Sequence, residues 1–159
     1  MPTITPFLWF DGQAEAASAF YRSVFADTKA GAVVRAGPGA DAPVFTAAFE
    51  LEGQPFIALN GGPHFTFNEA VSFLVSCADQ AEADDLWDKL AAGGTPGRCG
   101  WLKDRFGLSW QIVPAELRDL MGDPDPVRAG RVRAALMGMG RIDLAGLRAA
   151  RDGAGGPQG

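Results

Sequence analysis

The polar residues that could take part in chemistry are few, and they lie on otherwise apolar segments of the sequence. Asn60 and Gln111 are uncharged amides within strand-like runs, and Asp104 lies between apolar neighbours. Buried amides need hydrogen-bond partners, which here are each other, water or a ligand. Asp104 has two interpretations: a salt bridge with Arg98 or Arg105, or an inward-facing acid that recognises a cationic ligand.

The other side chains with chemical potential are one histidine and two cysteines. His64 lies in a glycine- and proline-containing loop, where it is either a solvent-exposed side chain or a proton-transfer group at the mouth of a binding cleft, since an unperturbed pKa of ~6.5 suits that work. Cys77 and Cys99 belong to no CxxC motif, and we expect both to be reduced. The sequence therefore predicts no catalytic nucleophile, and it does not identify a catalytic residue.

Tryptophans alternate with other residues in three strand-like segments. Trp9, Trp101 and Trp110 are most simply explained by core packing. We expect at least one of them to line a concave sheet face, which makes an aromatic ligand plausible.

The elements that must position these residues follow a duplicated pattern. Apolar residues recur at the helical spacing i, i+3, i+4, i+7, i+8, and the same pattern returns 66 residues later. The second helix begins at Asp79, with Glu82 three residues on, which resembles a capping box. The two stripes are Ala17, Phe20, Tyr21, Val24 and Phe25, and then Ala83, Leu86, Trp87, Leu90 and Ala91.

Strand-like runs flank each helix in the same order. A hairpin turn is predicted at residues 52–54, and the two halves are expected over residues 1–62 and 68–114. Each half is predicted to be a βαβββ unit, with the second half trimmed. Residues 1–114 are thereby expected to form an α+β domain whose paired units make a curved mixed sheet with a cleft. The strand predictions are residues 3–10, 32–36, 44–52 and 55–60, then 70–78, 98–106 and 108–113.

Beyond Pro114 the period becomes helical. Residues 115–152 are predicted to form a helical extension, with Asp125-Pro126 as a helix start, and residues 153–159 are predicted to be a disordered tail. Residues 1–113 carry 7 basic and 13 acidic side chains, whereas residues 114–159 carry 7 and 6. The arginines of the extension have no aromatic residue among them, so we expect no nucleic-acid binding.

The bulk composition is that of one globular chain. Its 159 residues are 47% hydrophobic and 21% charged, which excludes both a disordered chain and a membrane protein. The longest uncharged stretches are broken by glycine and proline, so no membrane span is expected. The start Met1-Pro2-Thr3 lacks a basic signal-peptide region, and we expect a cytoplasmic protein.

Several motifs resemble one family. Residues 9–21, beginning Trp-Phe-Asp-Gly, resemble the opening of the PhnB-like branch of the vicinal oxygen chelate superfamily, often labelled 3-demethylubiquinone-9 3-methyltransferase-like. Residues 60–63, 67–70, 99–112 and 141–144 resemble other segments of that branch. The resemblance covers nearly the whole chain. It implies homodimers, commonly with halves exchanged between partners.

Metal-using members of this superfamily bind a divalent ion through two His and two Glu or Gln residues. The matching positions here are Ile4 or Thr5, Ala58 or Asn60, Val71 or Ser72, and Gln111. None is a His or a carboxylate, so we expect no metal site and no cofactor. Methyl transfer is also unexpected, because a nucleotide-like methyl donor usually needs a glycine-rich turn between a parallel strand and a helix.

The leading hypothesis is therefore a metal-free homodimer that binds a small apolar or aromatic molecule in its sheet cleft. The alternatives are a metal-assisted lyase, isomerase or dioxygenase with a degenerate ligand set, and a non-enzymatic interaction module. The predicted ligand-binding residues are Trp9, Asn60, His64, Ser72, Trp101, Asp104 and Gln111.

Overall fold

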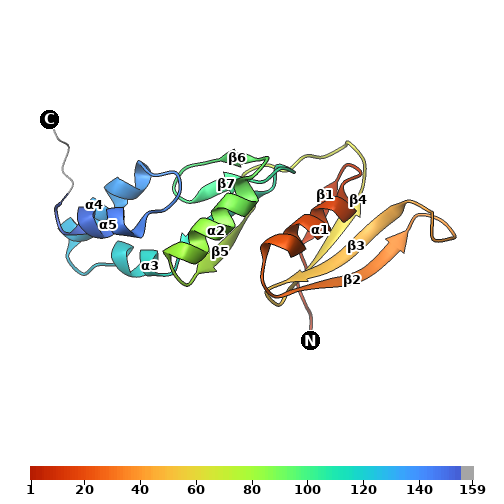
Figure 1. Cartoon of the computed structure of the whole chain (residues 1–159), viewed down its shortest axis with the longest axis horizontal. Helices are drawn as coiled ribbons and strands as arrows, with labels where there is room; N and C mark the ends of the chain where they lie inside the picture. The colour runs from red at the N-terminus through yellow and green to blue at the C-terminus, as the bar shows by residue number, and fades with distance from the viewer. Residues whose placement is uncertain (155–159) are drawn as a thin grey trace. The chain divides into compact units, whose positions relative to one another are not determined.

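The computed structural model describes residues 1–154 and confirms the α+β class. The chain divides into two compact units, Met1–Phe67 and Asn68–Gly159. Figure 1 shows the first unit in red to yellow and the second in green to blue. Both units contain the predicted βαβββ order.

The first unit is a four-stranded sheet with one helix. Strand β1 pairs in parallel with β4, and the other neighbours are antiparallel, in the order β1-β4-β3-β2. Its elements are β1 (Phe7–Phe10), α1 (Ala14–Val24), β2 (Thr28–Arg35), β3 (Val44–Leu51) and β4 (Gln54–Asn60).

Helix α1 covers one face of this sheet (Figure 1). Tyr21 of the helix is fully buried and stacks on Phe49 at 6.0 Å, and Phe49 stacks on Phe56 at 5.3 Å. Aromatic rings at these distances contribute beyond the area that they bury. Strand side chains alternate between faces. Because α1 is the only helix of this unit, the opposite face of its sheet receives no helix from it.

The second unit repeats the plan and then extends it. Its sheet order is β5-β8-β7-β6, again with a single parallel pair, β5 and β8. Its elements are β5 (Ser72–Cys77), α2 (Gln80–Ala91), β6 (Thr95–Pro96), β7 (Trp101–Lys103), β8 (Ser109–Pro114), α3 (Glu116–Met121), α4 (Pro126–Met137) and α5 (Leu144–Arg151).

Helix starts agree with the predicted capping residues. The Asp79 side chain accepts the Glu82 N–H at 2.9 Å. Asp125 and Asp143 cap α4 and α5 by accepting the N–H groups of the residues two positions on, Val127 and Ala145. The Glu82 carboxylate returns to the N–H of Ala78 rather than to that of the capping residue. Capping side chains satisfy backbone donors that the first helical turn leaves open.

The three C-terminal helices have a small core of their own and are bonded to the second unit. That core contains Leu120, Val132, Ile142, Leu144 and Leu147. Gln80 of α2 donates to the Ile142 carbonyl at 2.9 Å and accepts the Leu144 N–H at 2.8 Å. The Gly100 N–H donates to the Gly140 carbonyl at 2.8 Å. The extension is thus part of the second unit.

Several predicted boundaries differ from the observed ones. The hairpin turn is only Glu52 and Gly53, both with positive φ (48° and 80°), as a two-residue turn between twisted strands requires. The segment predicted as one strand over residues 98–106 contains the three-residue β7 followed by a turn. Of the predicted terminal tail, residues 155–159 lie outside the described residues.

Gly100 provides a test of how the extension packs. It has φ +83°, and a Cβ there would lie 2.7 Å from Ile142 Cδ1 and 2.9 Å from the Ile112 carbonyl oxygen. Gly107 has φ +84° with no atom within 4 Å of the same position. We expect Gly107→Ala to cost about 1–2 kcal/mol from backbone strain alone, and Gly100→Ala to cost about 1–3 kcal/mol more because of the clash. Urea unfolding of both variants measures the difference, and equal losses would contradict this packing.

Candidate functional site

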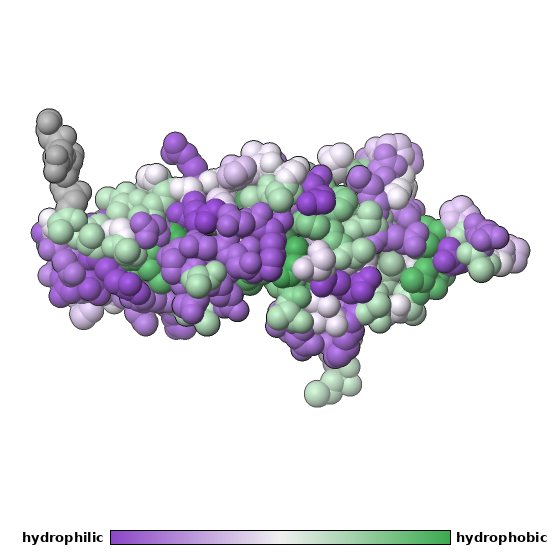
Figure 2. Space-filling model, viewed as in Figure 1, coloured by the Kyte–Doolittle hydropathy of each residue, from purple (hydrophilic) through white to green (hydrophobic). Residues whose placement is uncertain are grey.

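The face of the first sheet opposite α1 is the first candidate surface. Register places Phe7, Ile57 and Ala48 on this face, side by side on β1, β4 and β3. Phe7 is 55% exposed, and Val34 on β2 is 52% exposed. Figure 2 shows hydrophobic residues at the molecular surface over β2 and β3. We call this surface the open face of the first unit.

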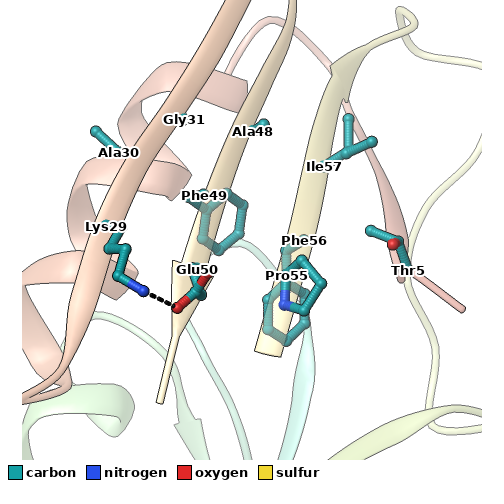
Figure 3. Close-up of a pocket in the computed structure, with 10 residues that line it drawn as sticks. All are labelled: Thr5, Lys29, Ala30, Gly31, Ala48, Phe49, Glu50, Pro55, Phe56 and Ile57. Carbon is teal, nitrogen blue, oxygen red and sulfur yellow. Dashed lines mark hydrogen bonds and ion pairs between the residues drawn. The ribbon is translucent and has the colours of Figure 1, made fainter. Parts of the chain in front are cut away.

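A hollow of about 360 Å³ lies on this open face (Figure 3). Small side chains make its floor, because a Cβ at Gly31 would lie only 2.9 Å from the Ala48 Cβ. Ile57 and Pro55 of β4 lie between the lining residues of β3 and Thr5, as Figure 3 shows. The volume is within the range of small-molecule sites. The lining residues are Thr5, Lys29, Ala30, Gly31, Ala48, Phe49, Glu50, Pro55, Phe56 and Ile57.

One ion pair lies at the rim of the hollow. Lys29 Nζ is 2.6 Å from Glu50 Oε1, and the lysine side chain is 65% exposed. The hydrogen bond and the charge of Glu50 raise the pKa of Lys29. The rim therefore carries paired charges, whereas the floor is apolar.

The segment after β4 holds Trp9 in place at the end of β1. The Trp9 indole N–H donates to the Gly62 carbonyl at 2.9 Å, and its ring lies edge-on to Phe65 at 4.9 Å. A Cβ at Gly61 would overlap the indole at 2.2 Å, so glycine is required there. Trp9 is half-buried, whereas the nearby His64 is exposed.

Asn60 bonds to the backbone of its own unit. Its side-chain oxygen accepts the Ala14 N–H at 2.8 Å, and its side-chain nitrogen donates to the Val44 carbonyl at 3.0 Å. The N-cap position of α1, Gln13, makes no side-chain cap bond. Asn60 therefore performs that function for α1 from the neighbouring strand.

The second sheet presents a corresponding open face, opposite α2. Trp101, Gln111 and Leu74 lie side by side on β7, β8 and β5. The Gln111 amide nitrogen donates to Ser72 Oγ at 2.9 Å. Trp101, Gln111 and Ser72, predicted from the sequence to contact a ligand, thus share one sheet face.

Trp110 and Asp104 lie at the opposite, covered side of this sheet. Trp110 is 2% exposed and lies 5.6 Å from Phe73. Asp104 is also 2% exposed, and its carboxylate accepts three hydrogen bonds, from the Phe106 N–H (2.8 Å), the Leu108 N–H (3.1 Å) and the Trp110 indole N–H (2.9 Å). These bonds fix the turn between β7 and β8.

The two cysteines are free thiols. Burial raises the pKa of the Cys77 thiol to about 11, because desolvation disfavours the thiolate. Cys99 is half-buried, and its thiol lies 3.5 Å from the Leu136 carbonyl. Cys77 at that pKa would be a poor nucleophile near neutral pH.

The superfamily's metal does not fit the residues at the positions assigned to it. Ile4 is 92% exposed and apolar, Ala58 faces α1, and the Asn60 amide is bonded to backbone. Ser72 and Gln111 supply only a hydroxyl and an amide. Within residues 1–154, no three His, Cys, Asp or Glu side chains are grouped so as to hold an ion. These side chains do not form the divalent-ion site of that superfamily.

Residues 1–154 contain no helix that combines the length and the apolar character needed to cross a membrane.

Comparison with known proteins gives the family. The family model described as 3-demethylubiquinone-9 3-methyltransferase matches residues 2–113. The PhnB protein of Bacillus cereus is similar in structure with a TM-score of 0.65 and 36% identity, over 72% of this chain and all of that protein. The chain belongs to this family.

More distant structures share the fold of this family member. A protein from Pseudomonas aeruginosa is 22% identical, with a TM-score of 0.55, over 69% of this chain and 95% of its own. The fosfomycin resistance protein FosX from Mesorhizobium loti is 11% identical, with a TM-score of 0.56, over 76% and 97%. The predicted membership of the vicinal oxygen chelate superfamily is confirmed. No curated protein matches the chain.

Most of the residues that line the hollow were not predicted from the sequence. Gly31 and Ala48 are small residues within strands, and only the cross-strand register brings them together. Lys29 and Glu50 are also register partners, but Lys29 precedes the strand predicted over residues 32–36, so the predicted pairing did not include it. Thr5 was considered only as a metal position, and it lines the hollow instead.

Asp104 can be tested as a structural residue of this fold. Asp104→Asn leaves one acceptor oxygen for three donors and turns an amide N–H₂ toward some of them. We expect a loss of about 2–3 kcal/mol in the free energy of unfolding. Asp41→Asn, in the exposed loop after β2, should change it by less than ~0.5 kcal/mol. Denaturant unfolding followed by tryptophan fluorescence measures both, and an unchanged midpoint for Asp104→Asn would contradict this role.

Proposed function

We propose that this protein binds a small apolar or aromatic molecule on the open faces of its βαβββ units, as a cytoplasmic homodimer with exchanged halves. The observation that carries the proposal is the hollow on the first open face, which has an apolar floor and a volume of about 360 Å³. Leaving an apolar sheet face of this kind in water costs free energy, because transfer of apolar surface out of water is favourable.

The proposed ligand contacts are the predicted residues whose side chains lie on or beside these faces. They are Trp9 in the first unit and Ser72, Trp101 and Gln111 in the second, with His64 beside Trp9. Aromatic side chains offer a ligand both area and a preferred stacking geometry. Asn60 and Asp104 belong to the proposed site through the backbone that they hold.

Filling the hollow tests the binding proposal. Ala48→Leu adds three carbons above the floor, beside Gly31. With indole as a neutral aromatic probe, we expect saturable shifts of the Gly31 and Ala48 backbone amides in wild-type NMR spectra. Affinity should fall at least about tenfold in Ala48→Leu, which corresponds to ~1.4 kcal/mol. Ala40→Leu, in the exposed loop, is the matched control and should bind as wild type does. Equal indole binding by Ala48→Leu, or no shifts in wild type, would overturn the proposal.

The homodimer has its own test. The exposed apolar side chains Phe7 and Val34 of the open face support burial against a second copy. We expect light scattering after gel filtration to give about twice the 16.7 kDa chain mass for wild type. Phe7→Glu should give the monomer mass, because a buried charge at an apolar interface is costly. Val127→Glu, at an equally exposed position on α4, should remain dimeric, and a wild-type monomer would refute the homodimer.

A further inference from the structure

Ser109, the first residue of β8, is buried without a hydrogen-bond partner. It is 1% exposed, and its Oγ makes no hydrogen bond within the described part of the chain. A buried hydroxyl without a partner costs free energy, and native proteins contain few of them. Its presence on a strand that otherwise packs well indicates a partner that the described residues do not supply.

Two polar side chains flank this hydroxyl on the same sheet face. Ser109 is in register with Ser72 on β5 and with Lys103 on β7. Neighbouring strands lie about 4.8 Å apart, so the two hydroxyls are within reach of one small group. Ser72 Oγ accepts the Gln111 amide at 2.9 Å, and its own hydrogen is left to donate because a hydroxyl both donates and accepts.

The lysine is paired across β8. Lys103 forms an ion pair with Glu69, which precedes β5. Because the sheet order is β5-β8-β7, this pair crosses the start of β8, where Ser109 lies. The lysine and glutamate side chains are 40% and 62% exposed. Exposed ion pairs contribute little net stability, so an arriving anion can replace Glu69 at small cost.

We propose that Ser109, Ser72 and Lys103 bind the carboxylate group of a small organic acid. In the absence of this ligand, Glu69 pairs with the Lys103 ammonium. Two hydroxyl donors and one ammonium match the acceptor oxygens of a carboxylate. Trp101 and Leu74, both in register with Gln111, flank the site and suit the apolar part of the acid. This inference rests on the proposed function for that apolar part only.

Removing the internal competitor is the first test. The probe is sodium acetate, titrated against sodium chloride at constant ionic strength and followed by the backbone amide shifts of Ser72, Lys103 and Ser109. We expect Glu69→Gln to bind acetate about threefold to fivefold more tightly than wild type, the range that a weak exposed ion pair allows. Asp85→Asn is the matched control, because it frees Lys89 from a similar pair (2.6 Å) on α2. An equal gain in Asp85→Asn, or no gain in Glu69→Gln, would overturn the proposal.

Ser109→Ala separates binding from folding. The hydroxyl has no partner in the described chain, so its removal should leave the unfolding midpoint unchanged or raised, while acetate affinity falls at least about fivefold. Ser76→Ala, on the same face of β5, should change neither. A destabilised Ser109→Ala that binds acetate as wild type does would show the hydroxyl to be structural and would refute the site.

Two further probes separate this site from the proposed function. If inorganic phosphate shifts the same amides and binds with higher affinity than acetate, the carboxylate assignment is overturned in favour of phosphorylated ligands. Benzoate should bind more tightly than acetate. Benzoate no tighter than acetate would count against an apolar surface at this sheet and leave the carboxylate site standing. If the neutral benzamide shifts these amides and acetate does not, the apolar surface is supported and the carboxylate site is refuted.

Discussion

A β-sheet has two faces, and each βαβββ unit supplies a single helix to cover them. In the first unit α1 buries Tyr21 against Phe49, and the sheet has no other helix to place on its opposite side. Strand alternation then decides the location of every other side chain. The covered side contains the ring stack and Ala58, and the open side contains Phe7, Ile57 and the hollow. The open face is uncovered because the unit has no second helix to pack on it, and a ligand can bind there for the same reason.

The C-terminal helices remove little of this shortage in the second unit. They bond to α2 and to the loop before β7, and Val113 is the one sheet residue among the partly buried side chains packed against their core. Gln80 bonds to the backbone at Ile142 and Leu144, and Arg141 lies over the Trp87 ring at 5.8 Å. Gln80 and Trp87 both belong to α2, the helix that covers the second sheet. The Bacillus cereus relative aligns over its whole length with only 72% of this chain, and the family model ends at residue 113. The extension therefore lies beyond the residues that the family model matches.

Sequence patterns located the helices and most of the strands, but β6 at Thr95–Pro96 lies outside every predicted strand. They did not show which face of a sheet each strand residue lies on. Period and capping located α2 and its start at Asp79 correctly, because both signals are local. Asn60 shows the limit. It was placed among candidate ligand contacts on an apolar strand, whereas its amide bonds to the start of α1 and to β3. Whether a strand residue faces a helix or faces outward depends on register, and a shift of one residue reverses it. Gly31 and Ala48 come together through the same non-local pairing, so no spacing in the sequence reveals the hollow.

Asp104 and Ser109 show how hydrogen-bond accounting separates fold from function within one hairpin. Both are buried polar residues at the β7–β8 connection. The Asp104 carboxylate accepts three hydrogen bonds from its own turn, which accounts for the residue by folding alone. The Ser109 hydroxyl lies in the next strand with no bond inside the described chain. Within the described residues this hydroxyl adds no hydrogen bond to the fold. A buried group that the fold does not use, beside a lysine held only by an exposed glutamate, is therefore better explained by a ligand than by stability.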